Sequence, residues 1–180
     1  ICRFQNKLVF GSDHGEVFAL DSEKEEFSLI LDNRGNPIRV MLPEKDTLWM
    51  ALYGIGIVRV DAAFSIIDTI YHDNSGKGLI GNGNEIMAIY RDQFDSLWIG
   101  GYGGMCKLNP RTMTFEGVFD FNGSSGYVAS ILEDQQGNLW IGSNNGIYKY
   151  DRLLQVYTLM DSNHGLPTGR FFTSCASQTP

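Results

Sequence analysis

Polar residues that could bind a ligand stand in the short stretches between the apolar segments of this 180-residue chain. Aromatic rings beside amides and carboxylates suit a carbohydrate site, because the apolar face of a sugar stacks on a ring while its hydroxyls need donors and acceptors. The candidate ligand-binding residues are Asp13, His14, Tyr53, Tyr102, Asn144 and His164, and similar residues nearby are His72, Asn82, Asn84, Glu85, Tyr127 and Asn145. Each of these residue types is common in turns, so a single one does not indicate a site. They indicate a site only where the fold brings several of them together.

Recognised motifs for catalysis or cofactor binding are missing from the sequence. The stretch Gly76–Gly81 satisfies G-x-G-x-x-G, but it lies in a loop before an expected strand, without the helix N-terminus that holds a pyrophosphate. The sequence has no G-x-S-x-G, H-E-x-x-H or P-loop pattern. The three cysteines, Cys2, Cys106 and Cys175, lack the close spacing of metal and redox sites. We therefore expect no catalytic residue, no metal, no cofactor and no disulfide.

Charge and hydropathy exclude several classes of partner. The net charge is −7, and the basic residues never form a run, so we expect no binding to nucleic acid or to anionic membrane surfaces. No apolar stretch approaches the length of about eighteen residues that a membrane-spanning helix needs, and the first residues carry no signal pattern. We expect a soluble chain, with any targeting segment or membrane span outside it.

One pattern recurs four times and predicts the elements that position these residues. It appears as Leu8–Gly11, Leu48–Ala51, Leu97–Gly100 and Leu139–Gly142, with steps of 40, 49 and 42 residues between the leading leucines. Each copy is followed by a turn and by a second apolar segment that ends on Asp or Asn; further apolar pieces lie before and after. Every unit therefore holds four short strands, and the chain is expected to be all-β. The predicted units cover about 1–34, 38–73, 85–121 and 127–161, and residues 170–180 are the first strand of a further unit.

Four strands in a unit of 40 to 50 residues are typical of a β-propeller blade. Trp49, Trp98 and Trp140 recur at one position, so we interpret them as packing between blades, and ligand stacking is the weaker alternative. Gly100 and Gly142 end the second strand where backbones approach closely. In Asn145-Gly146, both residues tolerate a positive φ, and the pair predicts a tight turn.

The segments Glu133–Asn138, Leu139–Gly142 and Asn145–Asp151 together resemble the two-component regulator propeller repeat. The resemblance is strong in the third and fourth units and weak in the first, where Val9 and Phe10 replace Trp and Ile. It implies a periplasmic, non-catalytic sensor region of a hybrid two-component histidine kinase, with seven-bladed propellers, a homodimeric assembly and a membrane span outside this chain. The four units are then a four-blade arc of a seven-bladed propeller, and a closed four-bladed ring is the alternative.

Propeller topology assigns the candidate residues to one face. In a propeller, the turns between second and third strands and the connections between blades lie on the same face. His14 is in such a turn and His72 and His164 are in such connections, so we expect all three on one face. We therefore predict a ligand-sensing module that binds a glycan or oligosaccharide there. A passive protein-interaction scaffold is the first alternative, and a glycan-acting enzyme of the sialidase or lyase type is the second.

The sialidase alternative is the weaker one because it needs three convergent arginines. The segment from Asp134 to Trp140 is similar to the Asp-box of sialidase propellers, but it has one more residue between Asp and Gly, and that box is structural. The arginines within or beside strands, Arg59, Arg91, Arg111 and Arg152, fall at positions that look solvated. No triad for a substrate carboxylate can be assembled from them.

Overall fold

The computed structural model describes residues 1–33, 35–71, 85–119, 126–167 and 171. In these residues it contains strands and one short 3₁₀ helix, η1 (Ser162–His164), and no α-helix. The strands are β1 (Cys2–Phe4), β2 (Lys7–Gly11), β3 (Glu16–Asp21), β4 (Glu26–Asp32), β5 (Ile38–Pro43), β6 (Thr47–Leu52), β7 (Gly56–Asp61), β8 (Ile66–Tyr71), β9 (Ile86–Arg91), β10 (Leu97–Gly101), β11 (Gly104–Asn109), β12 (Thr114–Phe119), β13 (Val128–Glu133), β14 (Leu139–Ser143), β15 (Gly146–Asp151) and β16 (Val156–Met160). The expectation of an all-β chain is confirmed.

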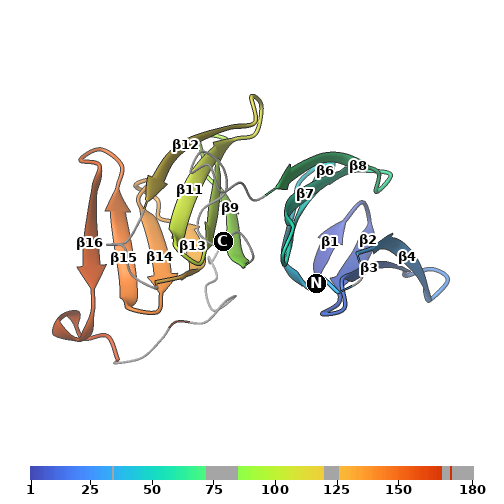
Figure 1. Cartoon of the computed structure of the whole chain (residues 1–180), viewed down its shortest axis with the longest axis horizontal. Helices are drawn as coiled ribbons and strands as arrows, with labels where there is room; N and C mark the ends of the chain where they lie inside the picture. Colours follow the sequence, from blue (N-terminus) through green and yellow to red (C-terminus); the bar gives the residue numbers. More distant parts are fainter. Residues whose placement is uncertain (34, 72–84, 120–125, 168–170, 172–180) are drawn as a thin grey trace. The chain divides into compact units, whose positions relative to one another are not determined.

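The strands form four antiparallel sheets of four strands each, in chain order: sheet I (β1–β4), sheet II (β5–β8), sheet III (β9–β12) and sheet IV (β13–β16). Within a sheet each strand pairs with the next in the chain, as β13 to β16 do in Figure 1. The chain divides into two compact units. Unit 1 contains sheets I and II, and unit 2 contains sheets III and IV, with β9 from Met87 onward.

The Asp or Asn that ends each third strand organises the turn that follows. Asp21, Asp61, Asn109 and Asp151 each accept two backbone N–H groups through Oδ1, at distances of 2.8 to 3.3 Å. A short side-chain acceptor can replace the backbone carbonyl in a tight turn. This is why the third segment of every repeat ends on one of these two residue types.

Near the end of the second strand, Gly11 and Gly100 contact the first strand of the next sheet within their unit, whereas Gly142 contacts β13 of its own sheet. A Cβ built on Gly11 would lie 2.7 Å from Ile38 Cβ, and a Cβ on Gly100 would lie 2.4 Å from Val128 Cγ1. A Cβ on Gly142 would lie 2.5 Å from Ser130 Oγ and 3.6 Å from Phe171 Cβ. The predicted close approach at Gly100 and Gly142 is confirmed.

Each unit has its own core between its two sheets. In unit 1 the core contains Phe4, Val9, Val17, Leu48 and Met50, all at most 2% exposed. In unit 2 it contains Trp98, Met105, Val128, Leu139, Ile141 and Tyr150 among others. Trp98 of sheet III lies 6.1 Å, centroid to centroid, from Tyr150 of sheet IV, which confirms that Trp98 packs between sheets. Trp49 is fully buried, whereas Trp140 is half-buried.

The predicted turn at Asn145-Gly146 is wrong in detail. Ser143 pairs with Gly146, so the two loop residues are Asn144 and Asn145, and Gly146 begins β15. The positive φ falls on Gly146, at 134°, and not on Asn145. Gly56 and Gly104 have φ values of 129° and 119° at the matching place, which explains why glycine recurs there.

Several predicted features lie outside the described residues. These are the Gly76–Gly81 motif, His72, Asn82, Asn84, Cys175 and, except for Phe171, the further strand predicted over 170–180. Phe171 itself donates its backbone N–H to Ser143 O at 3.2 Å, as Ile38 does to Ser12 O at 3.1 Å. Phe171 therefore takes the position relative to sheet IV that β5 takes relative to sheet I.

Candidate functional site

The predicted site residues of unit 1 lie in turns. Asp13 and His14 are in the turn between β2 and β3, where His14 Nδ1 lies 3.8 Å from Asp13 Oδ1 and both side chains are more than 80% exposed (88% and 84%). Tyr53 follows β6, and its ring centroid lies 5.5 Å from the guanidinium carbon of Arg39. These residues offer polar and aromatic surface, and ligand binding by them stays a prediction.

Two predicted residues of unit 2 are brought together through a third, Tyr127. Tyr102 and Tyr127 form a β-bridge with ring centroids 5.4 Å apart, and Asn144 Oδ1 accepts the backbone N–H of Tyr127 at 3.0 Å. Tyr127 also donates its hydroxyl to Phe171 O at 3.2 Å. Tyr102, Tyr127 and Asn144 are called the Tyr102 surface below. The Tyr102 ring remains 41% exposed, so one aromatic face can stack on a ligand.

His164 has a local structural partner. It is the last residue of η1, and its Nδ1 lies 3.1 Å from Oδ1 of Asp161, which caps that helix. Glu85 is half-buried at the start of sheet III.

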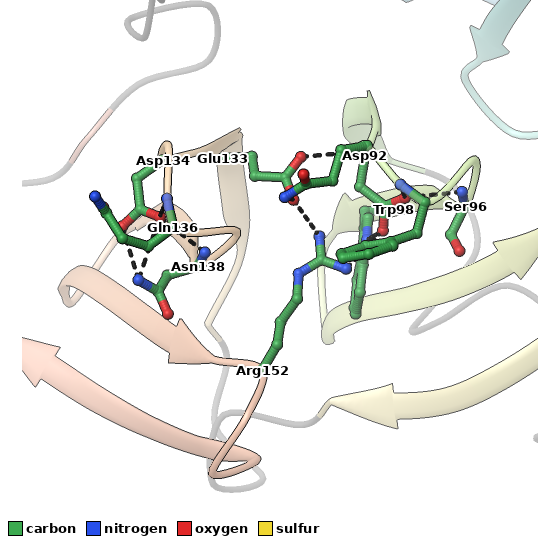
Figure 2. Close-up of polar contacts among 10 residues, drawn as sticks. Asp92, Ser96, Trp98, Glu133, Asp134, Gln136, Asn138 and Arg152 are labelled. Carbon is green, nitrogen blue, oxygen red and sulfur yellow. Dashed lines mark hydrogen bonds and ion pairs between the residues drawn. The ribbon is translucent and has the colours of Figure 1, made fainter.

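A buried ion-pair network, which the sequence analysis missed, joins sheets III and IV. Arg152, in the turn after β15, extends to a point between Asp92 and Glu133 (Figure 2). Its two terminal nitrogens donate to Asp92 Oδ2 at 2.8 Å and to Glu133 Oε1 at 3.0 Å. Glu133 also accepts the backbone N–H and the side-chain amide of Gln93, each at 3.0 Å. The network therefore ties the β9–β10 turn to sheet IV.

Asp92 is the centre of this network, and its side chain is 0% exposed. Its Oδ2 also accepts the indole N–H of Trp98 at 2.7 Å, and its Oδ1 accepts the backbone N–H groups of Phe94 and Ser96 at 2.9 Å. Burial by itself raises the pKa of Asp92, but the hydrogen bonds from Trp98, Ser96 and Arg152 outweigh it, so this pKa lies below its ordinary value. The carboxylate is therefore charged at neutral pH.

Asp134 repeats the arrangement in sheet IV with a different partner. Its Oδ2 accepts the indole N–H of Trp140 at 2.9 Å. The same oxygen accepts the side-chain amide of Asn138 at 2.9 Å (Figure 2). Burial acts to raise the pKa of Asp134, but hydrogen bonds from Asn138, Trp140 and the Gln136 backbone lower it to about 2. The available sequence signal was an Asp six residues before the Trp in both units.

The prediction that Arg59, Arg91, Arg111 and Arg152 are solvated is wrong for three of them. Arg152 is only 17% exposed, Arg59 only 23% and Arg91 only 24%, because each pairs with a carboxylate, Arg59 with Asp68 and Arg91 with Asp95. Arg111 is 81% exposed, as predicted, and binds Asp95. The exposure of Arg152 was misjudged because one of its two partners, Asp92, comes from another sheet. Over the described ranges, no group of three or more His, Cys, Asp or Glu side chains could hold a metal ion.

Comparison with protein families identifies the repeats. Residues 80–103 and 122–145 match the two-component regulator propeller family, and each match includes one of the Leu-Trp-Ile-Gly motifs of sheets III and IV. These two stretches are two-component regulator propeller repeats. The four-stranded sheets are accordingly propeller blades.

Solved structures support the propeller fold. The extracellular domain of a one-component system of B. thetaiotaomicron matches 96% of this chain at 19% identity, with a TM-score of 0.73, and the match covers 24% of that protein. The extracellular domain of a hybrid two-component system of the same organism matches 97% of this chain at 19% identity, with a TM-score of 0.59 and 30% of that protein covered. No curated protein sequence matches the chain.

The propeller fold extends to a protein of a different kind. The WD40 domain of Pan2 from Neurospora crassa matches 87% of this chain at 11% identity, with a TM-score of 0.63 and 47% of that domain covered. At these identities the similarities establish the fold alone. The chain spans less than a third of the two extracellular domains.

The described residues contain no helix long enough to cross a membrane. Their one helix has three residues, whereas a membrane-spanning helix needs about twenty.

Proposed function

We propose that this chain is part of a ligand-sensing, extracytoplasmic propeller of a hybrid two-component sensor, located in the periplasm. The observation that carries the proposal is the match of two of its repeats to the two-component regulator propeller family. The likeness to extracellular domains of such systems agrees with it. On this proposal the chain is an arc of a larger propeller, the whole protein is a histidine kinase that acts as a homodimer, and this part binds without turnover.

The proposed ligand is a glycan or oligosaccharide that contacts the Tyr102 surface. Tyr102 offers a 41% exposed ring whose other side packs on Tyr127. A ring supported from behind loses little freedom on binding, and the apolar face of a sugar stacks on such a ring. The neighbouring Asn144 and Asn145 amides are the donors and acceptors that sugar hydroxyls would use.

The test is calorimetric titration of the chain with oligosaccharide fractions, using wild type, Tyr102→Ala and His14→Ala. Tyr71→Ala is the matched control, because Tyr71 is also an exposed tyrosine but lies at the end of β8. We expect Tyr102→Ala to weaken binding about tenfold, as loss of one stacking ring does, and Tyr71→Ala to leave it unchanged.

Each other result has a defined meaning. Binding that neither Tyr102→Ala nor His14→Ala weakens would contradict the placement of the ligand. Accumulation of shortened oligosaccharides would contradict binding without turnover. Absence of binding to every fraction would favour signalling through protein contacts, as in a scaffold propeller.

A further inference from the structure

A hollow of about 440 Å³ lies between sheets III and IV of unit 2. Its walls come from β10, β11 and β12 on one side and from β15 and the turn after it on the other. The lining residues are Trp98, Lys107, Glu116, Gly117, Phe119, Tyr150, Arg152 and Gln155. This volume falls within the range of sites that hold small organic molecules. None of these residues is among the predicted site residues, although ligand stacking by Trp98 was the weaker alternative to packing.

The apolar part of the hollow is a continuous aromatic wall. Phe119 lies 5.4 Å from both Trp98 and Tyr150, centroid to centroid, and Trp98 and Tyr150 are 6.1 Å apart. These rings come from both sheets and support one another. At Gly117 the register between β11 and β12 shifts, and this residue has a φ of 67° and no side chain, so the outer strand leaves space beside Phe119. Trp98 and Tyr150 are buried, at 2% and 8% exposed, so the half-buried Phe119 is the ring of this wall that the flat apolar face of a ligand can reach.

The polar part of the hollow is charged but already neutralised. Lys107 Nζ lies 2.9 Å from Glu116 Oε2, and Arg152 is held by Asp92 and Glu133. An anionic ligand would have to displace Glu116 from Lys107, and a cationic one would meet both Lys107 and Arg152. An uncharged ligand with hydroxyl groups can donate to Glu116 and accept from Lys107 without breaking an ion pair. Gln155 adds an amide that donates and accepts.

We propose that this hollow is a binding site for an uncharged, ring-shaped polyhydroxy compound, such as a neutral hexose or pentose unit. It is a second site, distinct from the Tyr102 surface. Tyr102 directly follows β10 and is four residues from Trp98, which in an extended backbone is a separation of roughly 13 Å. The inference rests on the lining of the hollow and does not require the Tyr102 surface to bind a ligand. Because the ligand touches two sheets, its binding stabilises their packing.

The experiment compares two lysines that occupy the same place in successive sheets. Lys107 pairs with Trp98 across β10 and β11, and Lys149 pairs with Trp140 across β14 and β15, but only Lys107 lines the hollow. The variants are Lys107→Met, Glu116→Gln and the control Lys149→Met. The probes are the methyl glycosides of glucose, galactose, mannose and xylose, with methyl glucuronoside as the charged counterpart. Binding to the full chain is followed by saturation-transfer NMR and by the shift in melting temperature.

We expect at least one neutral glycoside to bind and to raise the melting temperature. Lys107→Met and Glu116→Gln each weaken this binding about tenfold, which corresponds to losing a hydrogen bond to a charged group, while Lys149→Met changes it less than about twofold. Far-ultraviolet circular dichroism of each variant confirms that it is folded. Two different side chains on the polar wall keep the test valid if one variant is unstable.

Three results would overturn the inference. One is the failure of every neutral glycoside to bind the wild-type chain; another is equal weakening by Lys107→Met and Lys149→Met; the third is tighter binding of the glucuronoside. Tyr102→Ala in the same titrations separates the two proposals. Binding lost only with Tyr102→Ala overturns this inference and supports the proposed function. Binding lost only with the Lys107 and Glu116 variants supports this inference and contradicts the Tyr102 surface as the place where these glycosides bind.

Discussion

Asp92 and Asp134 occupy the same position in successive sheets, but the hydrogen bonds of their carboxylates are satisfied in two different ways. Both carboxylates accept an indole N–H from the Trp six residues later and two backbone N–H groups from their own turn. Asp92 takes its remaining hydrogen bond from Arg152 of the next sheet, while Asp134 takes it from Asn138 of its own turn. Asp92 thus depends on the packing of two sheets, and Asp134 is satisfied locally.

Replacing Arg152 with Met tests the buried network. The variant leaves Asp92 and Glu133, with side chains 0% and 6% exposed, without their cation. Loss of one partner of a buried pair costs about 3–5 kcal/mol of unfolding free energy. Urea unfolding measures this loss. The matched control is Arg111→Met, whose 81% exposed side chain also pairs with an aspartate, and which we expect to leave the midpoint unchanged. Equal effects of the two variants would contradict the role of the network.

Asp134 predicts a loss of stability in acid. Its pKa is about 2 in the folded chain, against about 3.9 for an unfolded aspartate. The unfolded chain therefore binds a proton first as the pH falls, so the stabilisation is fully present above about pH 5 and disappears as the pH approaches about 2. Urea unfolding of wild type and Asp134→Asn between pH 7 and pH 2 measures the difference. The unfolding free energy of the variant should depend less steeply on pH than that of the wild type.

Among the elements, a glycine near the end of the second strand in sheets I and III limits how closely the next sheet can pack, as Gly11 and Gly100 show. A Cβ at Gly100 would lie 2.4 Å from Val128 Cγ1, a distance at which something must move. Sheet II has Ala51 at the matching place, and this residue is 1% exposed.

Gly100→Ala is expected to destabilise the chain by about 1–3 kcal/mol through overpacking. Val128→Ala removes Cγ1, the nearest clashing atom, and leaves Val128 Cβ at 2.8 Å, so it relieves part of the overlap. The double variant Gly100→Ala/Val128→Ala should therefore be more stable than the sum of the two single losses predicts. A double-mutant cycle measured by urea unfolding gives this coupling. Strict additivity would show that Gly100 and Val128 do not compete for the same space.

For the molecule as a whole, the cysteines test the absence of disulfides. Cys106 is fully buried in β11, as predicted, and Cys2 is a half-buried thiol in β1. We expect a thiol count of three after denaturation without reductant. A count of one would mean a disulfide within the chain, and the pair Cys2–Cys175 would then have to be examined by mass spectrometry.

The repeats, the strand pattern and the structural residues could be predicted from the sequence because each depends on neighbours in the chain. The closing Asp or Asn and the recurring glycine act within a single turn, as Asp151 and Gly146 do. The Trp at position 98 was recognised as packing because it recurs. The turn at Asn145 was misjudged by one residue, since the pairing of Ser143 with Gly146 decides which residues form the loop.

Contacts between sheets depend on the tertiary structure and could not be predicted. Asp92 and Arg152 are 60 residues apart, and only the packing of sheets III and IV places them 2.8 Å from each other. The residues next to Arg152 and Arg111 in the sequence do not distinguish them. Both were predicted to be solvated, but only Arg111 is. Likewise, Tyr102 and Asn144 both contact Tyr127, whereas His164 pairs with Asp161 of its own turn. A residue's neighbours along the chain determine its strand or turn, but the atoms that satisfy its charge come from whichever sheet packs against it.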